Sequence, residues 1–469
     1  MLSGVKQELA ELARWRLRPE FRPYRDFFIR MVEREFITPE EQQLRQSAAL
    51  RQMALEAADN VPYYHELFRT LQLDTASLAA SDWLSHLPIL SREDVQASFD
   101  RLRAPRYSLQ QGNARIAKTS GTTGQPVEVL HSIEYARMFT LLKQRELRMF
   151  RFDTRQSFAS IRSPIDLPRR ADRKALGKGE EFRHDRWPLV GRYFETGPFA
   201  CFGNNNDIEQ QANWLHDRRP NYLLAHSADL EHIALAYQPL GNADFLQGML
   251  AVSQQMKESM RHNIARSFSA PLQQNYGLNE IGLVASRCPH SDHYHVHAEH
   301  CLVEITDNEG RPLPPGQRGR LLVTSLGNPA MPLLRYDSDD LAEIPTEPCP
   351  CGRTLPSFRK IEGRYRRNAY LPEGTWTFWD ALLNALDQIP KAQFAHIRQY
   401  QLHQYRDGRF QFRIVASEDI AHTLEAELRT AIERILPESS AKLELVQVTE
   451  IPRPASGKIQ NFTSDFIPD

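Results

Sequence analysis

Residues 118–126 read KTSGTTGQP, and no other stretch of the 469-residue chain says more about its fold and chemistry. Glycine allows close backbone approach and positive φ, while hydroxyls and successive N–H groups can donate to phosphate oxygens. The stretch therefore predicts a phosphate-wrapping loop formed by Ser120, Gly121, Thr122, Thr123 and Gly124. A Ser/Thr/Gly turn that binds nothing is the alternative. Because no Lys follows the glycines, the Walker-type loop of kinases and GTPases is excluded.

Further motifs follow the loop in a fixed order: YGLNE at 276–280, RYDSDD at 335–340, GR at 363–364 and RPASGK at 453–458. Together with the loop, they resemble the ordered motifs of the adenylate-forming enzyme superfamily. The phrases NVPYY at 60–64 and LPILSRED at 87–94 resemble its phenylacetate-CoA ligase branch, which includes capsule-biosynthesis-type paralogues. The resemblance covers nearly the whole chain.

The length exceeds what a single hydrophobic core usually serves, so two or more domains are expected. Strands alternate with helices from about residue 116 to 285, which predicts an α/β fold. By resemblance, residues 1–362 form a large multi-layer adenylation domain of α/β subdomains plus a β-rich part, and residues 363–469 form a small mobile α+β domain. Residues 1–100 are its helical lead-in, and residues 288–352 its β-rich, zinc-bearing part.

Local patterns predict individual elements. Residues 40–59 read as a helix with Leu44, Ala48, Met53 and Leu55 on its buried face, followed by a turn at 60–62. Strands are expected at 222–226, 301–305, 319–324, 410–415 and 442–448. Helices are expected at 229–237 and 419–435.

Composition narrows the class of protein. Hydrophobic residues make up 41% and charged residues 25%, as in ordinary globular proteins, and the formal net charge of -1 favours neither nucleic acid nor a membrane as a partner. The sequence has no signal-peptide pattern and no long apolar run, so we expect a cytoplasmic protein. Five cysteines in so long a chain do not make a disulfide framework.

Four residues predict a metal centre: Cys288, His295, Cys349 and Cys351. Three thiolates and one imidazole suit a closed tetrahedral Zn²⁺ site, and Pro289, Pro350 and Gly352 supply bends. The same positions occur in many phenylacetate-CoA-ligase-like proteins, where the zinc is structural. The alternative ligands His290, His293, His297 and His300 are interpreted as a metal-free surface segment, and Cys201 and Cys301 as small buried hydrophobic residues.

The resemblance implies roles for the other motif residues. Glu280 would hold Mg²⁺, Tyr276 would stack on adenine beside Gly277, Asp340 would accept hydrogen bonds from ribose, and Arg364 would bridge ribose and phosphate. Lys458 would place its ammonium between the substrate carboxylate and the α-phosphate of ATP as negative charge develops. Without the resemblance, Tyr276 could be a core aromatic, Asp340 a turn residue and Arg364 a surface ion pair.

The acid would enter between residues 222–233 and 276–284. There Ala225, His226, Ser227 and Gly282 leave room for a flat ring. His226 could face the substrate carboxylate or a ring substituent, or it could be a structural histidine. The sequence thus predicts ATP- and Mg²⁺-dependent activation of an aromatic or arylalkanoic acid.

The acceptor is expected to be coenzyme A. Two departures from the family pattern, SQQ at 253–255 and YRRN at 365–368, leave alternatives open. The first is transfer to an amine or a carrier-protein thiol, and the second is a nucleotide-binding scaffold without catalysis. Relatives often dimerise, so a homodimer is compatible with the resemblance.

Overall fold

The computed structural model describes the following residues: 18–79, 82–118, 127–164, 166–167, 175–252, 256, 258–362, 368–370, 376–378, 397–416, 426, 430, 443–451 and 462–465. Within these ranges, no helix combines the length and the apolar character needed to cross a membrane. The chain divides into two compact units that are not continuous in sequence. Unit 1 comprises Met1–Arg155, Asp185–Gly197 and Gln273–Gly363, and unit 2 comprises Gln156–His184, Pro198–Leu272 and Arg364–Asp469.

Unit 1 begins with helices. They are α2 (Arg25–Glu33), α3 (Pro39–Asn60), α4 (Pro62–Thr70), α5 (Arg92–Ala97) and α6 (Phe99–Leu102), and α7 (Ile133–Met149) follows later in the chain. Thr38 caps α3 by accepting a hydrogen bond from the Glu41 N–H, and Pro62 opens α4 directly after the predicted turn. The predicted helix is confirmed, and its predicted buried face is right for Met53, which is buried, but wrong for Leu44 and Ala48, which are exposed. Leu44 is 71% exposed, and the buried side chains are Leu50, Met53, Ala54 and Ala57, which follow the helical i, i+3, i+4, i+7 spacing.

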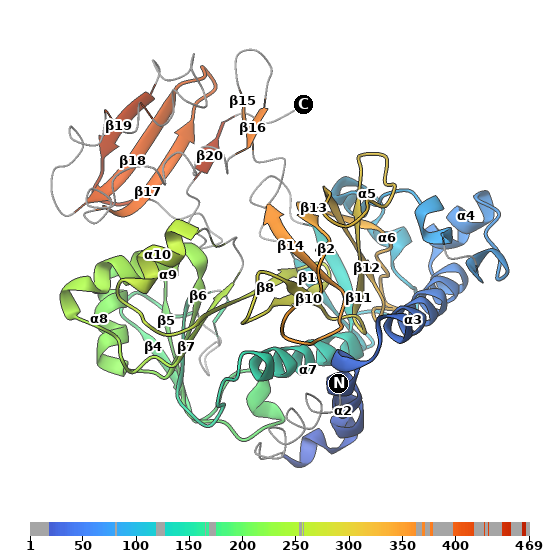
Figure 1. Cartoon of the computed structure of the whole chain (residues 1–469), viewed down its shortest axis with the longest axis horizontal. Helices are drawn as coiled ribbons and strands as arrows, with labels where there is room; N and C mark the ends of the chain where they lie inside the picture. The colour runs from blue at the N-terminus through green and yellow to red at the C-terminus, as the bar shows by residue number, and fades with distance from the viewer. Residues whose placement is uncertain are drawn as a thin grey trace. The chain divides into compact units, whose positions relative to one another are not determined.

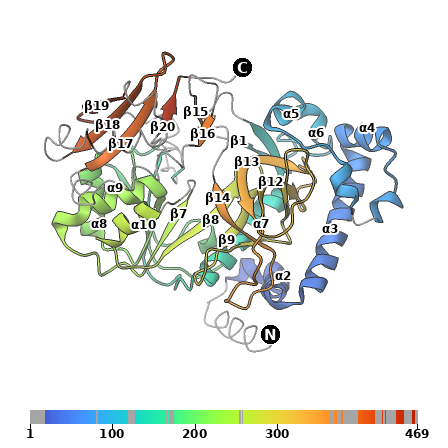
Figure 2. The same ribbon diagram turned by 45° about the horizontal axis from the view of Figure 1, so that its top comes forward.

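The strands of unit 1 form antiparallel sheets. β1 (Ala114–Lys118) pairs with β2 (Glu128–Ser132). The larger sheet runs in the order β11-β12-β13-β14-β10-β9-β8, and Figure 2 shows β12, β13 and β14 side by side. Its strands are β8 (Leu272–Leu278), β9 (Gly282–Arg287), β10 (Tyr294–Val296), β11 (Cys301–Thr306), β12 (Arg318–Ser325), β13 (Tyr336–Glu343) and β14 (Ser357–Glu362). The predicted β11 and β12 are confirmed, joined by the predicted turn.

Unit 2 contains a mainly parallel sheet in the order β7-β6-β3-β5-β4. Its strands are β3 (Phe158–Arg162), β4 (Glu181–His184), β5 (Phe199–Gly203), β6 (Tyr222–His226) and β7 (Gly248–Val252), with β4 the antiparallel edge. The helices α8 (Ile208–Arg218), α9 (Ser227–Tyr237) and α10 (Glu258–Ala265) lie together beside it in Figure 1. Their apolar faces and the sheet bury a core that includes Leu223, Leu230 and Met249. The predicted strand at 222–226 and the helix after it are confirmed.

The last part of the chain contributes further strands. β17 (Ile397–Gln404) pairs with β18 (Phe410–Ala416) in antiparallel fashion, and β19 (Leu443–Gln447) and β20 (Phe462–Ser464) add parallel neighbours. β15 (Asn368–Tyr370) and β16 (Trp376–Phe378) form a separate ribbon. The predicted strands at 410–415 and 442–448 are thereby confirmed. The predicted amphipathic helix at 419–435 lies, apart from residues 426 and 430, outside the described residues. The mixed α/β fold class is confirmed.

Candidate active site and metal centre

Glu280 lies at the tip of the hairpin that joins β8 to β9. Leu278 faces Gly282 across the hairpin, and Gly282 has a φ of +91°, a conformation that suits glycine. A side chain at Gly277 would bring its Cβ within 2.9 Å of the Gly282 carbonyl oxygen, so this tight turn also requires glycine there. The YGLNE motif therefore folds as a sharp, rigid support for the Glu280 carboxylate.

The β1–β2 hairpin brings both ends of the predicted phosphate loop to this turn. The Asn279 side chain donates to the Lys118 carbonyl at 3.2 Å, just before the loop. After the loop, Nε2 of His131 on β2 lies 2.9 Å from the Glu280 carbonyl oxygen. The residues of the loop itself, Ser120, Gly121, Thr122, Thr123 and Gly124, lie outside the described residues, but both strands that carry them contact the Glu280 hairpin.

Two tyrosine–carboxylate pairs cross between β8 and β13. Tyr276 donates to Asp340 Oδ2 at 2.6 Å, and Tyr336 donates to Glu280 Oε1 at 2.8 Å. Burial raises the pKa of both phenols well above the ordinary value, and the neighbouring carboxylates raise it further, so both phenols remain protonated donors. Since β14, β10 and β9 separate β13 from β8 in the sheet order, these bonds require the sheet to curl around its core.

The start of α5 places the guanidinium of Arg92 near the Glu280 carboxylate. The Leu90 N–H donates to the Arg335 carbonyl, and the Asp337 N–H donates to the Leu90 carbonyl, so Leu90 lies beside the start of β13 and Arg92, the first residue of α5, follows two residues later. Nη1 of Arg92 then lies 3.8 Å from Glu280 Oε1. Arg335, in contrast, is buried in the framework, with bonds to the carbonyls of Ser85 and Leu87.

Three side chains form hydrogen bonds with backbone carbonyl groups of the Glu280 turn. Besides His131, Tyr135 donates to the Ile281 carbonyl at 2.5 Å, and Nε2 of His300 lies 2.8 Å from the same oxygen. Burial lowers the pKa of His131, and it lowers that of His300 to about 4, so both rings are neutral near pH 7. A carbonyl only accepts hydrogen bonds, so each neutral ring carries its proton on Nε2.

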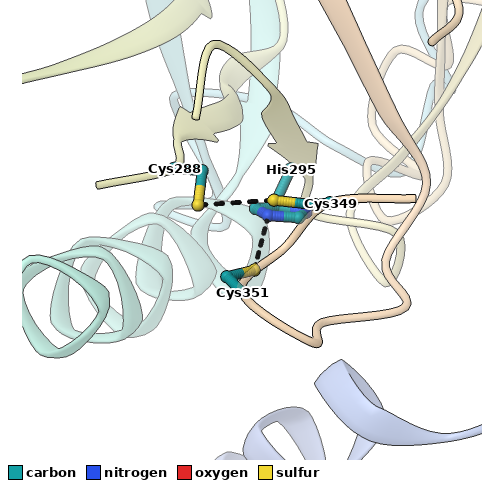
Figure 3. Close-up of side chains that lie close together, drawn as sticks. All are labelled: Cys288, His295, Cys349 and Cys351. Atoms are coloured by element: carbon teal, nitrogen blue, oxygen red, sulfur yellow. Dashed lines mark hydrogen bonds between the residues drawn. The ribbon is translucent and has the colours of Figure 1, made fainter. Parts of the chain in front are cut away.

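The predicted zinc ligands gather in a single cluster (Figure 3). Cys288 follows β9, His295 lies on β10, and Cys349 and Cys351 come from the loop before β14. Sγ of Cys349 lies 3.5 Å from Sγ of Cys288, Sγ of Cys351 lies 3.2 Å from Nε2 of His295, and all four ligand atoms lie within 4.8 Å of one another. Sulfur ligands of tetrahedral zinc, with bonds of about 2.3 Å, lie about 3.8 Å apart, so the donor set fits this metal.

The backbone around the cluster has the shape expected of a metal knuckle. The N–H groups of His290 and Arg353 point at Sγ of Cys288 and Cys351, at 3.4 and 3.5 Å. Gly352 has a φ of +78°, which allows the chain to turn back toward the sulfur atoms. Hydrogen bonds from the neighbouring thiols lower the pKa of Cys288, in the direction of the thiolate that binds zinc.

The interpretation of the remaining histidines as a surface segment is wrong for most of them. His293, His297 and His300 are buried against β9, β14 and α7, whereas His290 is exposed. The sequence HSDHYHVHAEH is polar, but His293 contacts Ser357 on β14, His297 contacts Ser286 on β9, and His300 stacks on Tyr135 of α7. Cys201 and Cys301 are fully buried, as predicted, and burial raises the pKa of both thiols.

Comparisons with known proteins agree with this geometry. No protein-family model matches the chain. The phenylacetate-coenzyme A ligase of Thermus thermophilus is 25% identical over 345 residues, 71% of this chain and 73% of that protein. The ligase of the same name from Escherichia coli is 24% identical over 343 residues, 70% of this chain and 72% of that protein. The chain is similar to the phenylacetate-CoA ligase branch of the adenylate-forming ligases. It is an AMP-forming ligase.

A solved structure extends the likeness in fold. 2-Hydroxyisobutyryl-CoA ligase, in the postadenylation state with R3-HIB-AMP, superposes with a TM-score of 0.73 at 17% identity, covering 92% of this chain and 91% of that one. Some of the residues predicted to bind nucleotide or to act in catalysis are not among those that the structure describes. Arg364 and Lys458 lie outside the described residues, as does the departure at 253–255.

The predicted acid-binding residues are divided between the units. Ala225, His226 and Ser227 are buried at the junction of β6 and α9 in unit 2, whereas Gly282 belongs to unit 1. Of the residues around Glu280, sequence reasoning missed Arg92, Tyr336, His131, Tyr135 and His300. Arg92 and Tyr336 were inside quoted motifs, so their proximity to motif residues was the available signal.

Proposed function

We propose that this ligase joins ATP to a carboxylic acid, releasing pyrophosphate and forming an acyl adenylate, and then transfers the acyl group to coenzyme A as a thioester. The names of the relatives support the overall reaction. The observation that carries the proposal is the position of the buried Glu280 carboxylate, at a turn touched by both strands that flank the phosphate-loop motif.

The chemistry explains why this arrangement is needed. The substrate carboxylate must attack the α-phosphate of ATP, and the two anions repel until cations and donors balance their charge. Mg²⁺, which prefers oxygen ligands, supplies part of that balance when bound, and the Glu280 carboxylate is the group that would hold it. Lys458 would supply the ammonium, and the loop at Ser120–Gly124 would hold the departing phosphates.

The nucleotide would be held by the residues around β8 and β13. Tyr276, with Gly277 beside it, would present its ring to adenine while its phenol stays bonded to Asp340. Asp340, whose Oδ2 accepts the hydrogen bond from this phenol, would accept a hydrogen bond from a ribose hydroxyl. Arg364 would reach the ribose and phosphate from the start of the last segment, residues 363–469, which we propose to be the mobile domain.

The Cys288, His295, Cys349 and Cys351 set would hold a structural zinc ion. It links two loops that are far apart in sequence, so its contribution would be to rigidity rather than to the reaction. The acid would be aromatic or arylalkanoic, as the names of the relatives suggest, and would occupy a pocket lined by Ala225, His226, Ser227 and Gly282. The homodimer allowed by the family resemblance stays a prediction.

An amine or a carrier-protein thiol is the second candidate for the acceptor. It is favoured by one sequence observation, the basic YRRN at 365–368, where relatives carry a different hinge. The two acceptors differ in a measurable product: with coenzyme A the enzyme releases a thioester, and with an amine it releases an amide.

Acid-dependent exchange of labelled pyrophosphate into ATP tests the first step. The panel should include phenylacetate, its ring-substituted analogues, benzoate and short branched acids. We expect exchange with at least one acid, strict dependence on Mg²⁺, and loss of exchange in Lys458→Ala. No exchange with any acid would contradict the proposal. Thioester formation on addition of coenzyme A then distinguishes the two acceptors.

A further inference from the structure

A cluster of polar side chains lies at the carboxyl ends of the parallel strands in unit 2. β3 lies between β5 and β6 in the sheet, so the chain moves to one side of β3 with β5 and to the other with β6. Ligands of open α/β sheets bind outside the carboxyl ends of the strands at such a switch point. Arg162 ends β3 and His226 ends β6, and Asp166 and Asn204 follow β3 and β5.

His226 is fully buried, and one face of its ring is fixed by the protein. Nδ1 of His226 lies 3.1 Å from Oδ2 of Asp229, which also accepts a hydrogen bond from Asn204 at 2.7 Å. A carboxylate accepts hydrogen bonds, so the imidazole donates through Nδ1, and in the neutral ring Nε2 then carries the lone pair. Asp229 thereby sets both the tautomer and the orientation of the ring.

The other nitrogen has no such partner. Within the described part of the chain, Nε2 of His226 makes no hydrogen bond, although it is buried. The nearest charged group toward which it points is Asp166, whose Oδ2 lies 4.0 Å away, beyond hydrogen-bond distance. Asp166 is 36% exposed and is held by Arg162 at 3.2 Å. Nε2 of His226 and Oδ2 of Asp166 thus lie close enough together for one hydrogen-bond donor group to contact both atoms.

We propose that His226 determines substrate specificity by accepting a hydrogen bond from a hydroxyl or amino substituent on the acid. This inference rests on the proposed function, and it narrows the substrate class to acids that carry such a donor. When the substituent is an amino group, Asp166 accepts its second N–H, and Asp229 acts as a positioning residue through the ring. A site that bonds a polar substituent discriminates strongly against the analogue without it, because its own buried acceptor is then left unpaired.

Matched acid pairs test the inference with the full-length enzyme. The pairs are phenylacetate with its 2-, 3- and 4-hydroxy and amino derivatives, and isobutyrate with 2-hydroxyisobutyrate. For each pair, kcat/KM in pyrophosphate exchange gives a preference ratio. We expect the wild type to favour one donor-bearing acid by about tenfold or more over its partner. In His226→Phe the ratio should fall toward one, whereas His262→Phe, which changes an exposed histidine on α10, should keep it.

Two further variants keep the test informative if His226→Phe does not fold. His226→Gln retains an acceptor oxygen and should keep part of the preference, and Asp229→Asn should reduce the ratio by freeing the ring. A wild-type enzyme that activates acids without such a preference, or a ratio unchanged in both His226 variants, would overturn the inference and leave the proposed function intact. Absence of exchange with every acid would instead overturn the proposed function.

Discussion

Two buried glutamates of unit 1, Glu35 and Glu280, differ in how many cationic groups surround their carboxylates. Glu35 is fully buried and bonds Arg145 at 2.9 Å, Arg353 at 2.7 Å and also Arg148. Burial alone would raise the pKa of Glu35, but the charges of Arg148, Arg145 and Arg353 hold it well below the ordinary value. Every oxygen of this carboxylate is therefore engaged by the protein.

Glu280 is almost as buried but much less compensated. Its carboxylate accepts a hydrogen bond from the Tyr336 phenol at 2.8 Å and lies 3.8 Å from the Arg92 guanidinium, and both contacts involve Oε1. Burying a carboxylate with so little compensation is costly unless another cation completes its surroundings. The difference teaches that burial does not distinguish the roles of the two residues. Glu35 is a framework charge, whereas Glu280 is the carboxylate that we propose holds a ligand.

The largest expected effect is on stability, in Glu35→Gln. Removing the charge leaves three guanidinium groups without their shared partner, which should lower the free energy of unfolding by roughly 3–5 kcal/mol. Denaturant unfolding measures the change, and Glu33→Gln, an exposed neighbour, should stay within about 0.5 kcal/mol of the wild type. Equal stability of the two variants would remove the framework role assigned to Glu35.

The proposed zinc site adjoins the Glu35 cluster, because Arg353 follows Cys351 by two residues and bonds Glu35. Cys351→Ser should bind less than one zinc ion per chain and lose roughly 2–4 kcal/mol of stability, a part of what structural zinc supplies to small domains. Elemental analysis and denaturant unfolding check this. The exposed neighbour variant His290→Gln should keep its zinc, and wild-type zinc content in Cys351→Ser would contradict the assignment of the ligands.

A smaller effect is expected around Glu280. Tyr336→Phe removes one donor to the carboxylate, so about tenfold lower kcat/KM for ATP is expected at limiting Mg²⁺, in line with one charge-assisted hydrogen bond. Initial rates at several Mg²⁺ concentrations measure it, with Tyr107→Phe as the control. If Tyr336→Phe lost only stability and kept its dependence on Mg²⁺, the phenol would be structural and the contrast with Glu35 would be weaker.

The effect that is smallest near neutral pH, and that grows as the pH falls, comes from His300. Its folded-state pKa of about 4 lies below the ordinary 6.5, so the unfolded chain binds the proton first as pH falls. Stability contributed by the neutral ring is complete above about pH 6.5 and declines toward pH 4, by about 1.4 kcal/mol per pH unit for one such group. Unfolding measured across this range should show a shallower slope in His300→Gln. An unchanged slope would contradict the neutral, buried state of this ring.

Several features were predictable because they are local in sequence. The YGLNE and RYDSDD motifs are short patterns, as is each half of the predicted zinc set, and the strands at 222–226 and 301–305 follow from apolar runs beside turns. The face of α3 was not, since Leu44 suggested a buried position that the helical period does not support. The pairing of Tyr336 with Glu280 depends on how the sheet curls across intervening strands. No local pattern carries that information.

The Glu35 cluster was missed for a related reason. Arg145 and Arg148 lie in QRELRM, which reads as the solvated part of a helix, yet α7 is enclosed between β9 and the start of the chain. Such a cluster exists only because residues 35, 145, 148, 299 and 353 meet in space. The sequence therefore identifies the charged residues, but it does not show which of them form ion pairs in the folded chain.

Manganese binding in the presence of ATP tests most directly whether Glu280 is positioned for a ligand. Mn²⁺ shares the preference of Mg²⁺ for oxygen ligands and is detected by electron paramagnetic resonance. We predict that Glu280→Gln, at wild-type stability, binds Mn²⁺ with ATP at least about tenfold more weakly than the wild type, the effect of losing one charged ligand. Equal Mn²⁺ affinity in the variant and the wild type would contradict this account.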